Sequence, residues 1–71
     1  MRNPQTPLSP LEQEAFDRLE QQFDSGDNFE RETALIQLKY AEFEREEATE
    51  LIEQLLLKGY LYEVDEGLRI T

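Results

Sequence analysis

The sequence predicts an α+β fold in which three helices precede a C-terminal β-hairpin. A helical stripe of apolar residues over positions 48–56 stops at Lys58-Gly59, where a helix would end. Two short strand-like stretches follow at once around Asp65-Glu66-Gly67, a turn sequence. The 71 residues allow one domain with one modest core. We expect that domain over residues 8–71, after a flexible lead-in or linker over residues 1–7.

The first helix is expected to start at a capping box. Ser9 suits the N-cap, Pro10 suits the first helical position, and Glu12 closes the box. From there the helix should reach about Phe23, ahead of a polar loop over residues 24–28. The residues expected to face inward are Leu11, Ala15, Phe16, Leu19 and Phe23.

The phrase FERE occurs twice, at residues 29–32 and 43–46. Each phenylalanine stands five residues before an alanine, a spacing that fits a hydrophobic staple, with Glu30 and Glu44 as caps. We therefore expect a second helix over residues 31–40, and a third that ends at Lys58 before a left-handed Gly59. Three residues separate these helices, as in a helix-turn-helix, although this turn lacks the glycine that many carry. The second helix should bury Ala34, Leu35 and Leu38.

The C-terminal hairpin should have strands over residues 60–64 and 68–71. A three-residue loop would place Gly67 where a positive φ is needed. Because side chains alternate along a strand, the set with Tyr62 and the set with Leu61 face opposite ways. We favour Tyr62 and Val64 as partly buried packing, but the alternation also allows the reverse. An outward Leu61 would form an apolar patch with Leu57; the alternative is that both sets serve mainly as packing.

Three helices, a tight turn and a terminal hairpin are the elements of a winged helix-turn-helix, with the hairpin as the wing. Over residues 8–71 the chain resembles small archaeal winged-helix domains, especially the C-terminal domain of archaeal minichromosome maintenance (MCM) helicases. In that domain a glutamate-rich helix, lysine-glycine, a hydrophobic-tyrosine-glutamate stretch, a turn and a short last strand close the chain, and residues 55–71 resemble that ending. The resemblance implies a regulatory or protein-contacting module of the replication machinery.

The charge balance opposes the usual role of such a fold. There are 17 acidic and 7 basic side chains, a net charge of −10 at pH 7. Such a field repels nucleic acid and anionic membranes and favours basic partners. It fits either an acidic interaction surface or adaptation to high internal salt, and the composition leaves both open.

The third helix, which would enter the major groove of DNA, is rich in glutamate. Glu46, Glu50, Glu53 and Leu57 follow one another at spacings of four, three and four, so they share one face. This face is either simply solvated or a docking surface for a basic protein. Base readout would need donors such as arginine or lysine, and only Arg45, Thr49, Gln54 and Lys58 could serve. The candidate partner-binding residues are Arg45, Glu46, Thr49, Glu50, Glu53, Gln54, Leu57 and Leu61.

The wing gives no indication of phosphate contact. Wings that bind DNA carry basic residues, whereas this tip is Asp65-Glu66-Gly67 with Arg69 as the only nearby cation. We expect a turn selected for its geometry.

Catalysis and several binding chemistries are disfavoured by the residue types. The absence of cysteine and histidine excludes disulfides, thiol or imidazole catalysis and ordinary zinc sites. No phosphate-binding glycine loop or EF-hand spacing occurs, and the longest aliphatic run is too short to span a membrane. We expect an intracellular, cytoplasmic non-enzyme without cofactor, metal, membrane contact or small-molecule substrate, whose partner is a basic protein surface rather than duplex DNA. The alternatives are a DNA-binding regulator adapted to high salt and a DNA mimic.

Overall fold

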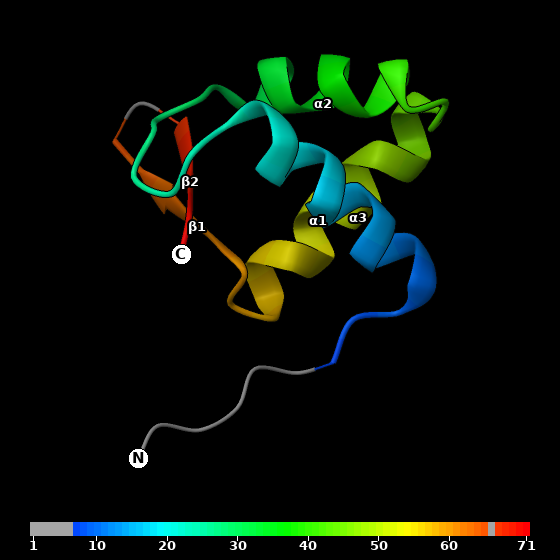
Figure 1. The fold of residues 1–71 in the computed structure, drawn as a ribbon, viewed down its shortest axis with the longest axis horizontal. Coiled ribbons are helices and arrows are strands. Elements are labelled where there is room, and N and C mark those ends of the chain that lie inside the picture. Colours follow the sequence, from blue (N-terminus) through cyan, green and yellow to red (C-terminus); the bar gives the residue numbers. More distant parts are fainter. Residues whose placement is uncertain (1–6, 66) are drawn as a thin grey trace.

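The computed structural model describes residues 7–65 and 67–71 and has the layout of a winged helix-turn-helix (Figure 1). Three helices are followed by a two-stranded antiparallel hairpin, as predicted, and the hairpin lies at one end of the helices. The elements are α1 (Pro10–Gln22), α2 (Arg31–Tyr40), α3 (Arg45–Leu57), β1 (Leu61–Val64) and β2 (Gly67–Ile70). Residues 1–6 of the expected lead-in, and Glu66 of the wing tip, lie outside the described residues. None of the described helices has the length and apolar character needed to cross a membrane.

The predicted capping box starts α1. The Ser9 hydroxyl accepts a hydrogen bond from the Glu12 backbone N–H at 3.3 Å, and the Glu12 carboxylate accepts one from the Ser9 N–H at 2.9 Å. The helix ends at Gln22, one residue before the predicted end, because Phe23 takes an extended conformation. The Phe23 ring stacks on Phe29 with centroids 4.1 Å apart.

The FERE repeat marks two helix starts, as predicted. Glu30 and Glu44 occupy the N-cap positions of α2 and α3, but neither side chain makes a capping hydrogen bond. The preceding phenylalanines, Phe29 and Phe43, are both buried in the core. The predicted cap positions and the placement of the helices are therefore confirmed, although neither glutamate adds a side-chain hydrogen bond to its helix start.

The wing is a tighter hairpin than the sequence suggested. Val64 pairs with Gly67, so two residues rather than three connect the strands, and Gly67 belongs to β2. Gly67 does have a positive φ, +152°, but its main role is to allow close approach of another segment. A Cβ at this position would lie 2.3 Å from the carbonyl oxygen of Phe29.

The segment before α2 adds a third strand-like piece to the wing. The Phe29 N–H donates to the Leu68 carbonyl at 3.0 Å, and the Leu68 N–H donates to the Phe29 carbonyl at 2.7 Å. This antiparallel bridge joins the loop after α1 to the wing. Figure 1 shows that loop passing beside the hairpin. A two-stranded hairpin is marginal alone, so the bridge helps to hold it against the helices.

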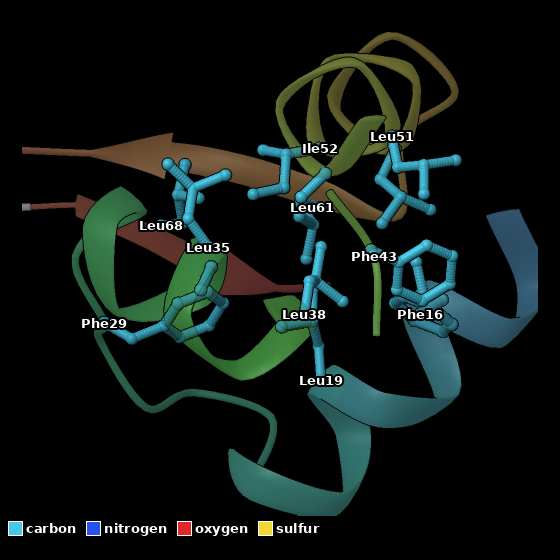
Figure 2. Close-up of a cluster of buried hydrophobic side chains, with 14 of the residues drawn as sticks. Phe16, Leu19, Phe29, Leu35, Leu38, Phe43, Leu51, Ile52, Leu61 and Leu68 are labelled. Carbon is cyan, nitrogen blue, oxygen red and sulfur yellow. The ribbon is translucent and has the colours of Figure 1, made fainter. Parts of the chain in front are cut away.

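The inward face of the wing is the reverse of the one we favoured. Leu61 is only 1% exposed, whereas Tyr62 is 41% exposed. Figure 2 shows Leu61 among core side chains that include Leu38 and Ile52. Alternation along a strand defines two faces but does not say which of them turns inward. Here the orientation follows from the turn at Gly59-Tyr60, whose backbone N–H groups bond to the carbonyls of Leu56 and Leu55 at the end of α3. The core consists of Ala15, Phe16, Leu19, Phe29, Ala34, Leu35, Leu38, Phe43, Ala48, Leu51, Ile52, Leu55, Leu61, Leu68 and Ile70.

One position of α1 also differs from the expected pattern. Leu11 is 49% exposed, while the neighbouring Glu12 is only 8% exposed. The Glu12 carboxylate forms an ion pair with Lys58 at the end of α3, with 2.5 Å between oxygen and Nζ. A charge can be buried when it is paired and hydrogen-bonded, and Glu12 satisfies both conditions.

Candidate protein-interaction surface

The outward side of α3 carries most of the predicted site residues. Glu46, Glu50 and Glu53 are exposed, and Leu57 at the end of the same face is 78% exposed. Together with Arg45 and Thr49, the three glutamates line a shallow open depression. We call this surface the α3 face: Arg45, Glu46, Thr49, Glu50, Glu53 and Leu57.

Two of the predicted residues lie elsewhere. Leu61 is a core residue, so the expected apolar patch of Leu57 and Leu61 does not form. Gln54 is half-buried and lies on the side of α3 that faces the start of α1, where it lines a second depression together with Leu11. That depression is also lined by Ser9, Glu12, Glu46, Glu47, Glu50 and Leu51.

Arg45 is held by a glutamate of the neighbouring helix. Its two terminal guanidinium nitrogens each donate to one carboxylate oxygen of Glu32 in α2, both at 3.0 Å. This hydrogen bonding and the attraction between the charges lower the pKa of Glu32 and raise the pKa of Arg45. The bidentate geometry uses the same donors that a phosphate or a guanine would need.

A matching pair crosses between the two helices in the opposite direction. Arg31 of α2 donates to Glu53 of α3 at 2.9 Å and reaches Glu63 of β1 at 3.5 Å. Arg31 and Arg45 are the arginines of the two FERE copies, and each stands at the first position of its helix. The sequence did not indicate Arg31 as a site residue, although its place in the repeat was a usable signal.

Two of the other candidates for base readout, Thr49 and Lys58, are also engaged. The Thr49 hydroxyl donates to the Arg45 carbonyl of its own helix at 2.8 Å. Lys58 is paired with Glu12 and also donates to the Pro7 carbonyl at 3.4 Å. The hydrogen bond from Lys58 is the main reason that the pKa of Glu12 is lowered.

The acidic groups of α3, by contrast, are only partly neutralised. Glu46, Glu47 and Glu50 are exposed and form no ion pair within residues 7–65 and 67–71. Glu46 and Glu50 share the depression on the α3 face with Arg45, whose charge is already balanced by Glu32. The α3 face therefore presents net negative charge to solvent.

The Arg69 side chain of the wing is held by two neutral hydrogen-bond acceptors. Arg69 donates from Nε to the Asn28 side-chain oxygen at 2.6 Å, and from Nη1 to the Tyr62 hydroxyl at 3.5 Å. Asp65 is exposed, and Gly67 lies against the Phe29 backbone. That contact explains why position 67 is a glycine.

A further concave surface, which the sequence did not indicate, lies between α2 and the turn that follows it. Its apolar lining is formed by Leu35, Ile36 and Phe43. Among the residues that the structure describes, no group of three or more acidic side chains is arranged to hold a metal ion.

Comparison with known proteins adds no relative: no family model matches the chain, and neither a curated protein nor a solved structure is detectably similar to it.

Proposed function

We propose that this domain is a non-catalytic winged-helix module of DNA-handling machinery that contacts a basic protein surface through its α3 face. The observation that carries the proposal is the pair of crossed ion pairs, Arg31 with Glu53 and Arg45 with Glu32. These pairs neutralise Arg31 and Arg45. Among the described residues, the negative charges of Glu46, Glu47 and Glu50 then have no cation paired with them.

Binding of this face to duplex DNA would have to overcome that arrangement. A DNA phosphate could reach Arg45 only by displacing Glu32, which already satisfies both terminal nitrogens. Affinity for DNA grows with the number of phosphates that lysine and arginine neutralise. With its cations paired and its glutamates exposed, the α3 face supplies repulsion instead.

A basic protein surface would be attracted by the same exposed glutamates. Each exposed pair between a partner lysine or arginine and a glutamate contributes only about 0.2–1 kcal/mol. Several such pairs, together with steering by the net charge of −10, still favour fast association that weakens with added salt. Leu57, exposed at the end of the same face, could supply apolar contact area.

The replication context of the proposal rests on the resemblance of residues 55–71 to the C-terminal domain of archaeal MCM helicases. Such a module would position or regulate another protein. The resemblance is one of pattern, so the context is a second and separable part of the proposal.

Fluorescence anisotropy with two labelled probes tests the proposal. One probe is a short duplex DNA, and the other is a short peptide of lysine, arginine, serine and glycine. We expect the peptide to bind at low salt and the DNA not to bind. The variant Glu46→Gln/Glu50→Gln should weaken peptide binding more than the control Glu20→Gln/Asp24→Asn, which removes the same charge from exposed positions at the end of α1 and just after it. Tight DNA binding that falls steeply with added salt would contradict the proposal.

A further inference from the structure

The groove between α2 and the α2–α3 turn is a feature that the α3 face does not explain. It has a volume of about 470 Å³, within the range of pockets that hold a ligand group. Leu35 and Phe43 are core residues that form its floor, and Ile36 is 44% exposed at its side. Its charged lining consists of Glu32, Lys39, Glu42, Glu44 and Arg45.

The turn at the edge of this groove has an unusual backbone. Glu42 has a φ of +71° and is the one described residue other than glycine with a positive φ. The Glu42 N–H donates to the Lys39 carbonyl at 2.9 Å and the Phe43 N–H to the Leu38 carbonyl at 3.0 Å, the two bonds of a Schellman motif. Glycine is the residue preferred at this position, and a side chain there costs free energy. Strained positions of this kind concentrate at functional sites.

The charges around the groove indicate the chemistry of an occupant. Glu32 is neutralised by Arg45, whereas Lys39, Glu42 and Glu44 form no ion pair within the described residues, so the two unpaired glutamates outweigh the one lysine in the lining. Arg45 lines both this groove and the depression on the α3 face, so the two surfaces are continuous. A second copy of this chain, itself at −10, would be repelled.

We propose that the groove takes one large apolar side chain, such as leucine, from a partner segment whose flanking lysine or arginine residues contact Glu42 and Glu44. The inference rests on the proposed function, because the same basic partner would cover the α3 face. It adds a specific contact, the anchor. The acidic surface attracts any basic segment, and the groove favours a segment that carries a large apolar side chain at the right place. The strained Glu42 keeps a carboxylate at the edge where glycine would leave none.

Two matched peptides test the anchor by fluorescence anisotropy. The first has a central leucine between two pairs of basic residues, and the second has serine in place of the leucine. Burial of a leucine side chain should make the first bind about tenfold more tightly. Ile36→Gln, at a half-exposed position, should remove this preference while the melting temperature shows that the domain still folds.

Two variants at the turn test the role of Glu42. Glu42→Gly and Glu42→Gln should each weaken binding of the leucine peptide several-fold, although only the first relieves the backbone strain. Glu14→Gln, which removes an exposed charge from α1, should leave binding almost unchanged. If both Glu42 variants bind like the parent protein, the assigned contact of Glu42 is wrong.

The outcomes separate this inference from the proposal on which it rests. Equal affinity for the two peptides would overturn the groove as an anchor site while the acidic docking face still stands. Binding of neither peptide would overturn the proposed function and the groove with it. A leucine preference that survives Ile36→Gln would place the apolar contact elsewhere and also overturn the inference.

Discussion

Glu42 and Gly59 occupy the same position of the same helix-ending motif. After α3, the Gly59 N–H donates to the Leu56 carbonyl and the Tyr60 N–H to the Leu55 carbonyl, which repeats the bond pattern that Glu42 and Phe43 make after α2. Both residues adopt the left-handed backbone conformation, with φ of +85° at Gly59 and +71° at Glu42. The molecule therefore contains one relaxed and one strained copy of a single turn.

Glu42→Gly should stabilise the domain. Relief of the left-handed strain outweighs the extra chain entropy of glycine, so we expect a gain of about 0.5–1 kcal/mol in the free energy of unfolding. Gly59→Ala should destabilise the domain by about 1–2 kcal/mol, since it introduces the same strain at the other copy. Chemical denaturation measures both values. A Glu42→Gly protein that is less stable than the parent would contradict this explanation of the turn.

Gly67→Ala should be much more harmful than a typical surface substitution. The new Cβ would meet the Phe29 carbonyl at 2.3 Å, so the bridge between Phe29 and Leu68 would have to open. Gly26→Ala is the control, because Gly26 also has a positive φ but no atom within 4 Å of an added Cβ. We expect Gly67→Ala to cost about 1–3 kcal/mol more than Gly26→Ala in thermal or chemical unfolding. Equal effects would mean that the close approach is unimportant.

The Glu12–Lys58 pair should make stability depend on acid pH. The hydrogen bond from Lys58 lowers the pKa of Glu12 in the folded state below the ordinary glutamate value of 4.5. A carboxylate with a lowered folded pKa contributes stability above its unfolded pKa, and that contribution is lost as the pH falls through the folded pKa. Glu12→Gln keeps a residue that can close the capping box but removes the charge. We expect the Glu12→Gln variant to lose less stability than the parent as the pH is lowered below 4.5. The control Glu14→Gln, at an exposed position, should behave like the parent.

Release of the two crossed arginines should create DNA binding. In Glu32→Gln/Glu53→Gln the guanidinium groups of Arg31 and Arg45 lose their main partners and become available to phosphate. We expect this variant to bind duplex DNA at low salt, with an affinity that falls as salt is added. Glu20→Gln/Asp24→Asn removes the same net charge and should not gain binding. If the two variants behave alike, overall charge rather than ion pairing excludes DNA.

The helices were predictable because their signals are local. The Ser9 capping box, the repeated FERE start and Gly59 each act within one turn of chain, and α2 begins and ends at the predicted residues. The inward face of the wing was not predictable, since alternation of Leu61 and Tyr62 fits either orientation. Burial of Glu12 in place of Leu11 was equally hidden, because it depends on a lysine 46 positions away.

The candidate site was predictable as a charge pattern but not as a set of contacts. Glu46, Glu50, Glu53 and Leu57 share an exposed face, as their spacing required. The crossed ion pairs depend on how α2 and α3 pack against each other, and no spacing along one helix reveals that. The groove beside Ile36 arises for the same reason, from two elements that meet only in the folded chain.

Backbone amide chemical shifts in the ¹⁵N-labelled domain test the central claim most directly. Duplex DNA and a short basic peptide would be added separately at low salt. We predict that the peptide shifts the amides of residues 45–53 on α3 and that the DNA leaves them unchanged. Shifts of the same α3 amides on addition of DNA, lost as salt is raised, would contradict the account.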